Sequence, residues 1–170
     1  MIKCLFLKNN LIGSRLIAWG TRRPGQKLDS IPSHCAFLFI VNGEERIIDS
    51  TLMSGVRETT LEEIIGHYEL IETIDLGFSE QESYKYLEKA RAKLVGRMYD
   101  VTAVIYFSVR VLLFKFFGIP IPTKSFIQFK FMWFCSEVYG FFSKKKENLT
   151  SPNDLLLLLR NKSYNIIQKE

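Results

Sequence analysis

The chain has 170 residues, a length that favours a single domain over residues 1–170, and 47% of them are hydrophobic, enough to supply a core. A net charge of +5 favours anionic partners such as membrane surfaces, cell-wall polymers or nucleic acid, but it is too small to choose among them. Three cysteines without paired spacing argue against a disulfide framework and for a reducing compartment.

The N-terminal part of the chain predicts a helix followed by a β-hairpin. Leu5 to Trp19 is apolar and reads as a short strand or turn that leads into a helix. Thr21 to Ser30 is a polar loop that contains Pro24-Gly25. His34 to Val41 is rich in β-branched and aromatic residues, and Asn42-Gly43 is a strong signal for a two-residue turn, so Glu44 to Ser50 is expected to return as the second strand.

The tight turn also sets which side chains share a face of the hairpin. Counting back from it places His34 opposite Thr51. Because side chains alternate along a strand, His34 then shares a face with Asp49, while Cys35 and Ser50 point the other way. A slip of one residue would reverse this arrangement.

The rest of the chain predicts one more strand and several helices. Glu69 to Asp75 alternates and reads as the third strand, and Ser79 with Glu82 forms a capping box. The most apolar segment of the chain is 101–119. Arg110 and Lys115 interrupt it, so a core helix is preferred there to a membrane span. The expected helices are 59–66, 79–95 closing on Gly96, 101–117, one starting near Trp133 and one starting at Ser151-Pro152. This order predicts an α+β fold with a central antiparallel sheet packed against helices.

Three residues are candidates for chemistry. Cys135, in "WFCSEVYG", is expected at the N-terminal end of a helix, where a helix dipole and a nearby histidine favour the reactive thiolate. His34 is the candidate base, and Asp49 can orient its ring by accepting a hydrogen bond. Each residue also has a structural interpretation, as a small buried hydrophobe, a structural histidine and a turn former, and residue types alone leave both interpretations open.

Five segments, in this order, give the chain a resemblance to a known family. They are "SRLIAWGTRR...PSHCAFLF", "RIIDSTLMSGVRETTLEEI" with Gly55-Val56, "LVGRMYD", "FCSEVYG" and "SPNDLL". Together they resemble the circularly permuted branch of the NlpC/p60 papain-like superfamily, the YiiX/YebB-like proteins. The resemblance covers nearly the whole chain and implies a permuted papain-like fold.

The resemblance also implies roles for individual residues. Cys135 matches the nucleophile, His34 the general base and Asp49 the orienting residue, where relatives commonly have glutamate. Tyr99 matches a tyrosine that lines the nucleophile pocket and can donate to the oxyanion, although a half-buried structural tyrosine is an equal alternative. Asp100 is expected to cap the following helix rather than act on substrate.

The implied function is a cysteine hydrolase or acyltransferase that acts on an amide or ester through a thioester. The substrate is expected to be a cell-wall peptide amide or a lipid acyl group, without a metal or other cofactor. The alternative is a non-catalytic binding or structural module that keeps the fold. Nucleic-acid binding is not expected, because no corresponding motif occurs. Without a recognisable signal peptide a cytoplasmic location is expected, with peripheral contact with a membrane or cell wall, or carriage in a virion or phage, as alternatives.

Overall fold

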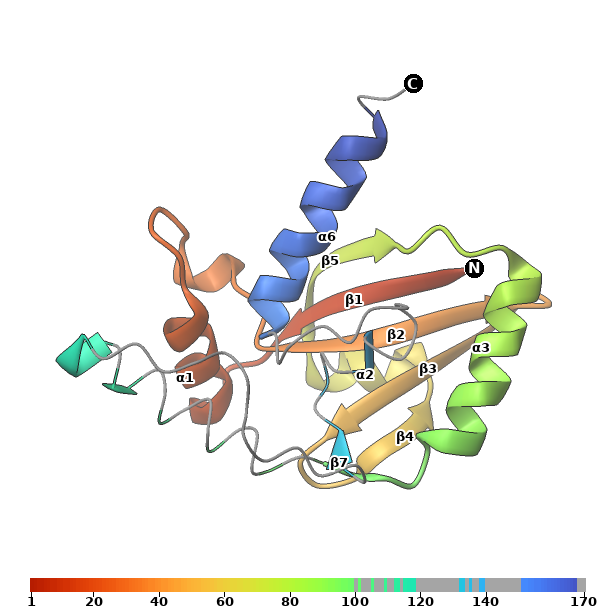
Figure 1. Cartoon of the computed structure of the whole chain (residues 1–170). Helices are drawn as coiled ribbons and strands as arrows, with labels where there is room; N and C mark the ends of the chain where they lie inside the picture. Colours follow the sequence, from red (N-terminus) through yellow and green to blue (C-terminus); the bar gives the residue numbers. More distant parts are fainter. Residues whose placement is uncertain are drawn as a thin grey trace.

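A five-stranded antiparallel sheet forms the centre of the molecule (Figure 1). The computed structural model describes residues 1–99, 101, 105, 109, 112–113, 115–118, 132–133, 135, 138–139 and 151–167. Within them the strand order is β4-β3-β2-β1-β5, and every neighbouring pair is antiparallel. The predicted α+β class and antiparallel sheet are therefore confirmed. The strands are β1 (Ile2–Lys8), β2 (His34–Val41), β3 (Glu44–Thr51), β4 (Gly55–Thr59) and β5 (Glu69–Asp75).

The predicted hairpin forms with the predicted register. Asn42 and Gly43 have φ angles of 52° and 77°, as a two-residue turn between twisted strands requires. β2 and β3 pair from Val41 opposite Glu44 as far as Phe37 opposite Ile48. Figure 1 shows the two strands fanning apart beyond these pairs. The start of β2 and the end of β3 therefore leave space between them for other side chains.

Two strands of the sheet differ from the prediction, one because it is longer than expected and one because it was not expected. The apolar segment at the N-terminus forms a full strand, β1, which lies between β2 and the edge strand β5. β4 extends the sheet beyond β3, where only a connection to a helix was expected. Its sequence, Gly-Val-Arg-Glu-Thr, is short and half polar, so its pairing with β3 decides its structure rather than its own strand propensity.

The helices largely follow the prediction. α3 begins with the predicted capping box, in which Ser79 and Glu82 exchange side-chain and backbone hydrogen bonds. Residues 101, 105, 109, 112–113 and 115–117 are helical, and no helix within the described residues is long and apolar enough to cross a membrane. The named helices are α1 (Ile12–Thr21), the 3-10 turn η1 (Leu28–Ser30), α2 (Leu61–His67), α3 (Glu80–Lys93) and α6 (Pro152–Ile167).

The segment before Cys135 differs from the prediction. Met132–Trp133 is not the start of a helix but a short strand, β7, which pairs in parallel with β6 (Met98–Tyr99). Cys135 lies in a turn, and Val138 and Tyr139 are helical. The prediction at Trp133 was wrong because a two-residue parallel pairing is a tertiary contact without a pattern of its own in the sequence.

Helices cover both faces of the sheet, and each face has its own apolar cluster. α3 and α6 contribute to the larger cluster, whereas α2, which lies behind the sheet in Figure 1, contributes to the smaller one. Successive residues of β2 enter the two clusters alternately, which explains why this strand is apolar throughout. The larger cluster includes Phe6, Cys35, Phe37, Phe39, Leu87, Cys135, Val138, Leu155 and Leu159; the smaller includes Leu7, Ala36, Leu38, Ile47 and Ile64.

Gly55 allows β4 to contact the segment that leads to β6. The Val56 amide donates to the Arg97 carbonyl and the Gly96 amide donates to the Val56 carbonyl, both at 2.8 Å. Gly55 has a φ of +65°, and a Cβ atom there would lie 2.2 Å from the Arg97 carbonyl oxygen. Only glycine therefore fits this close approach, which fixes the backbone immediately before Tyr99.

Candidate active site

His34 and Asp49 meet where β2 and β3 separate. His34 is the first residue of β2, and its Nε2 atom lies 2.6 Å from Oδ1 of Asp49 near the end of β3. The His34 side chain is 8% exposed and that of Asp49 is fully buried. The two residues therefore share a face of the hairpin as the alternation predicted, and the carboxylate holds the imidazole ring at one nitrogen.

An arginine that was not predicted lies on the other side of Asp49. Arg57 on β4 is opposite Asp49 in the register, and its Nε is 3.8 Å from Oδ2 of Asp49. The guanidinium also pairs with Glu63 of α2. Asp49 thus lies between two groups that carry or can carry positive charge, which offsets the cost of burying its carboxylate. The sequence did not indicate Arg57 because β4 itself was not predicted.

The thiol of Cys135 completes a continuous line of three groups. Cys135 is 1% exposed, and it is close enough to the His34 imidazole for the two groups to shift each other's pKa. Since Nε2 of His34 is engaged by Asp49, Nδ1 is the nitrogen left to face the thiol. The turn that holds Cys135 precedes the helical residues Val138 and Tyr139, and the residues between them lie outside the described part of the chain.

Cys35 is a buried core residue and a neighbour of Cys135. Both cysteines belong to the larger core cluster, and they are close enough to shift each other's pKa. Alternation predicted that Cys35 points away from His34 and Asp49, and it does so by facing the cluster that also contains Cys135. Cys135 packs on the Cys35 face of β2, and it reaches His34 because the histidine is the terminal residue of the strand.

Burial and mutual contact shift both titrating groups. Burial lowers the pKa of His34, but the neighbouring Cys135 and Asp49 raise it more, to about 10. Burial raises the pKa of the Cys135 thiol well above its usual value, and Cys35 adds to this effect, while His34 lowers it. Cys135 raises the His34 pKa through the charge that the sulfur has as a thiolate, so the two groups favour an imidazolium–thiolate pair, which has one proton fewer than an imidazolium with a neutral thiol.

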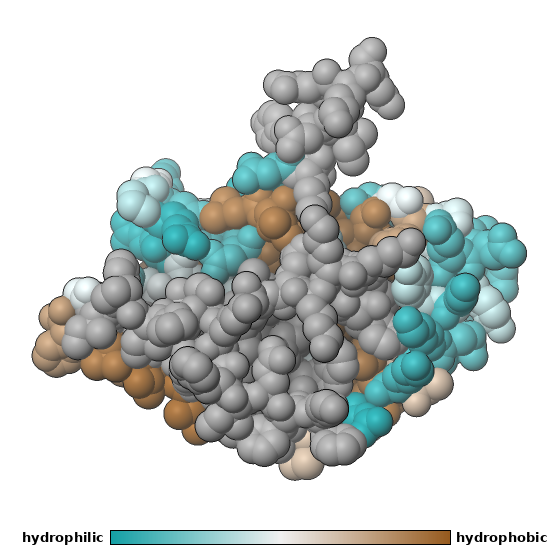
Figure 2. Space-filling view, viewed as in Figure 1, coloured by the Kyte–Doolittle hydropathy of each residue, from teal (hydrophilic) through white to brown (hydrophobic). Residues whose placement is uncertain are grey.

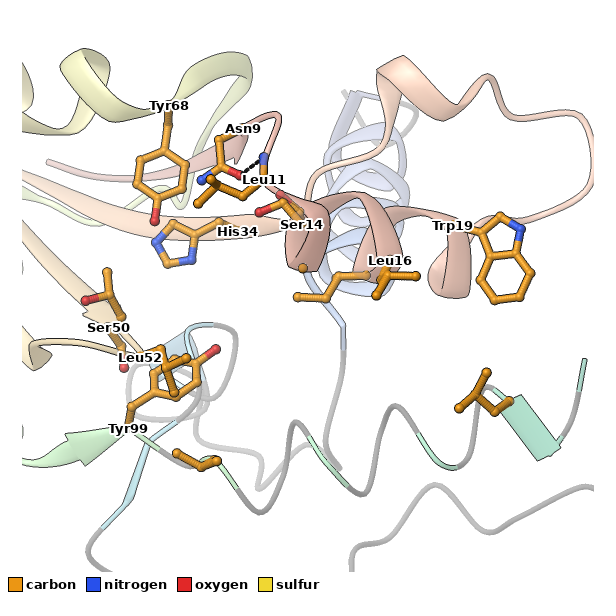
Figure 3. A pocket seen from close by; sticks show the side chains of 16 residues that line it. Asn9, Leu11, Ser14, Leu16, Trp19, His34, Ser50, Leu52, Tyr68 and Tyr99 are labelled. Carbon is orange, nitrogen blue, oxygen red and sulfur yellow. Dashed lines mark hydrogen bonds between the residues drawn. The ribbon is translucent and has the colours of Figure 1, made fainter.

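A pocket of about 440 Å³ lies beside His34. One wall is α1 with the residues just before it, and the helical residues Val101 and Leu112 lie on the other side. Figure 3 shows His34, Ser50, Tyr68 and Tyr99 together at one end, with Leu16 and Trp19 further along α1. Cys135 does not line this pocket, so a substrate held there must pass His34 and its neighbours to reach the sulfur. The lining residues are Asn9, Leu11, Gly13, Ser14, Leu16, Ile17, Trp19, Ser33, His34, Ser50, Thr51, Leu52, Tyr68, Tyr99, Val101 and Leu112.

Two tyrosines lie at the histidine end of the pocket. Tyr99, selected from the sequence, lines the pocket, and burial and the nearby thiols raise its pKa, so its hydroxyl keeps its proton and can donate a hydrogen bond. Tyr68 was not predicted. Its ring stacks on the His34 imidazole with 4.9 Å between centroids and 21° between planes. Tyr68 follows α2 directly, a position with no sequence signal for a site. Asp100 lies outside the described residues.

The described residues include no group of three His, Cys, Asp or Glu side chains arranged to hold a metal ion. The site itself presents a thiol, an imidazole, a carboxylate and hydroxyl groups. Comparison with known proteins finds no match among family models, curated proteins or solved structures.

Proposed function

We propose that the chain is a cysteine hydrolase or acyltransferase in which Cys135 is the nucleophile, His34 the acid–base group and Asp49 the orienting group. The observation that supports this most directly is the buried line of carboxylate, imidazole and thiol, which β3, β2 and the turn at Cys135 bring together. Such a line has the composition and order that nucleophilic catalysis by a thiol requires.

The reaction proceeds through a thioester. After the pair has lost one proton, the Cys135 sulfur attacks the carbonyl carbon of an ester or amide as a thiolate, with the remaining proton on His34. The oxyanion accepts a hydrogen bond from the Tyr99 hydroxyl. His34 then protonates the departing alcohol or amine as the carbon–sulfur bond is retained, and water or a second acceptor attacks the thioester and releases the thiol.

The lining of the pocket supports an apolar acyl group over a wall peptide. Away from His34 it consists mainly of Leu11, Leu16, Ile17, Trp19 and Leu112. These side chains offer few hydrogen-bonding partners for a peptide, whereas burial of a hydrocarbon chain against them is favourable. The acyl chain then extends along α1 and its carbonyl lies near His34.

The resemblance to the permuted NlpC/p60 branch supports the same assignment at the level of fold. In that branch the histidine strand comes first, the acidic strand second and the cysteine segment last. Here β2, β3 and the turn at Cys135 follow this order around an antiparallel sheet. We therefore propose a permuted papain-like arrangement within the observed α+β fold.

Acylation of the thiol tests the proposal. Purified protein is incubated with p-nitrophenyl butyrate, octanoate and palmitate, with a phospholipid and with a wall peptide, and adducts are located by mass spectrometry. We expect an acyl adduct on Cys135 and a loss of at least about a thousandfold in activity in Cys135→Ala. Cys4→Ala, which removes another buried thiol, is the matched control and keeps the activity. Full activity in Cys135→Ala on a confirmed substrate would refute the mechanism.

Burial of Cys135 favours a second candidate, a non-catalytic binding module with the same fold. A buried thiol with a raised pKa is a poor nucleophile unless substrate binding makes it accessible. Site-specific acylation distinguishes the two functions. A module that only binds would hold the acyl compound in the pocket without forming an adduct, and Cys135 would react no faster than Cys4 or Cys35.

A further inference from the structure

The apolar surface around the pocket extends to side chains that are largely exposed. On and before α1, Leu11, Ile12 and Leu16 are 68%, 80% and 61% exposed. On the opposite side, exposed apolar residues recur at 101, 105, 109, 112 and 116, a spacing that places them on one face of a helix. We call these residues, together with Phe117, the apolar rim. Figure 2 shows hydrophobic side chains gathered at the lower left, where α1 and residues 112–117 lie in Figure 1.

The two sides of the rim are joined into one surface. The ring of Trp19 on α1 lies 6.4 Å from that of Phe116. Lys115 lies over the Trp19 ring at 4.1 Å, and its Nζ donates to the Trp19 carbonyl at 2.6 Å. Leu11, Leu16, Val101 and Leu112 belong both to the rim and to the pocket lining. The rim is therefore continuous and borders the pocket.

The two segments that carry the apolar rim contain basic residues but no acidic ones. Residues 9–28 and 101–130 contain eight of the 23 lysines and arginines of the chain and none of its 18 acidic residues. Among the described ones, Arg15 and Arg22 are exposed, on α1 and directly after it, and Arg22 is close enough to Lys115 to lower its pKa. Exposed apolar side chains bordered by cations are typical of surfaces that lie in the interface of an anionic bilayer.

We propose that the apolar rim docks on an anionic lipid bilayer, with the pocket facing the membrane. The apolar side chains enter the boundary between headgroups and acyl chains while the cations contact the headgroups. A second copy of the chain fits less well, because an isologous contact would bring like charges together. Docking does not depend on chemistry at Cys135, so it can hold even if the proposed hydrolase activity does not.

Cosedimentation with vesicles tests the docking. We expect the full chain to bind vesicles of phosphatidylcholine with phosphatidylserine more tightly than vesicles of phosphatidylcholine alone, and to lose this difference in high salt. The double variant Ile12→Glu, Phe117→Glu changes two exposed rim residues that do not line the pocket, and it should weaken binding at least about tenfold. Arg15→Gln with Arg22→Gln should remove most of the preference for phosphatidylserine.

Matched changes on α3 serve as controls. Tyr84 is 52% exposed and Lys85 is exposed, and both lie on the helix at the far end of the molecule from α1 (Figure 1). Tyr84→Glu and Lys85→Gln should bind vesicles as the unchanged chain does, and circular dichroism checks that all variants fold. Binding by Cys135→Ala should also be unchanged, which separates docking from catalysis. The proposal would be overturned if the Ile12→Glu, Phe117→Glu variant bound vesicles as tightly as the unchanged chain. It would also be overturned if the chain formed a stable dimer that does not bind vesicles.

Discussion

Ser33, the residue before the histidine, provides a polar group in the pocket. It is 5% exposed, it lines the pocket, and its Oγ has no hydrogen-bond partner among the described residues. A buried hydroxyl without a partner costs free energy that a ligand can recover by hydrogen bonding to it. If the substrate carbonyl or leaving group supplies that partner, Ser33 contributes to binding as well as to the local structure.

We therefore expect Ser33→Ala to raise KM about five- to tenfold with a smaller effect on kcat, since one hydrogen bond to bound substrate is lost. Steady-state kinetics on the best ester substrate measure both constants. Ser30→Ala, at an exposed serine of η1 outside the pocket, is the control. An unchanged KM in Ser33→Ala would show that the hydroxyl does not contact the substrate.

Asp49 is one of two neighbours, with Cys135, that raise the proton affinity of His34. Burial lowers the pKa of His34, and Cys135 and Asp49 together raise it to about 10. The reactive pair has one proton fewer than the imidazolium–thiol pair, so kcat/KM should rise with pH from neutral toward that value. Asp49→Asn removes a charge that favours the imidazolium, so this rise should move to lower pH by about one unit.

The same variant should lower the maximal rate at least about tenfold, because the ring loses the carboxylate that orients it. A pH profile of kcat/KM separates the two effects, and a residue with only a structural role would not move the profile. Asp29→Asn, in the exposed turn η1, should leave the profile in place. If kcat/KM of Asp49→Asn rose over the same pH range as that of the unchanged chain, Asp49 would not be a partner that controls the protonation of His34.

At the scale of elements, the contact between β4 and the segment before β6 positions Tyr99. Gly55→Ala would place a Cβ atom 2.2 Å from the Arg97 carbonyl oxygen at a φ of +65°. We expect a loss of at least about 2 kcal/mol in the free energy of unfolding, because the backbone must move and the left-handed conformation is costly. Urea unfolding followed by circular dichroism measures this loss.

Gly66→Ala in α2 is the matched control. A Cβ atom there meets nothing within 4 Å, and alanine favours a helix, so this variant should be neutral or more stable by up to about 1 kcal/mol. In Gly55→Ala the catalytic rate should also fall, since Tyr99 follows the disturbed backbone. Equal stability of the two glycine variants would show that the β4 contact is not a fixed part of the fold.

These elements also show which features can be predicted from the sequence. The hairpin and the shared face of His34 and Asp49 follow from an Asn-Gly turn and from alternation along a strand, which are local properties. Three other strands, β4, β6 and β7, are too short to have such a pattern. β4 forms because it pairs with β3 and its Val56 amide donates to the Arg97 carbonyl, and β6 and β7 form because they pair with each other. Tyr68 and Arg57 were missed for the same reason, because their neighbours are set by packing between elements.

At the scale of the whole molecule, the last helix fixes one wall of the pocket. Asn153 on α6 is fully buried, and its Nδ2 donates to the Thr21 carbonyl at the end of α1 at 2.8 Å and to Oε1 of Gln26 at 3.0 Å. Arg23 pairs with Asp154 beside it. The "SPNDLL" segment therefore connects the C-terminal helix to α1, and the pocket depends on both ends of the chain.

The buried site should also make the stability of the whole domain depend on pH. The pKa of His34 rises from 6.5 to about 10 on folding. Between these two pH values the native chain therefore holds a proton on His34 that the unfolded chain has released. The stabilisation is complete below about pH 6.5 and is lost as the pH rises through about 10. Burial raises the pKa of Cys135, which lowers stability at high pH in the same direction.

We therefore expect the free energy of unfolding, measured by urea titration, to fall steadily between pH 7 and pH 10. His34→Gln should be less stable at neutral pH but should show a flatter dependence, because the group that gains a proton on folding is gone. His67→Gln, at the end of α2, changes the other histidine of the chain and is the matched control. Parallel curves for the unchanged chain and His34→Gln would mean that His34 does not gain a proton on folding through its contacts with Asp49 and Cys135.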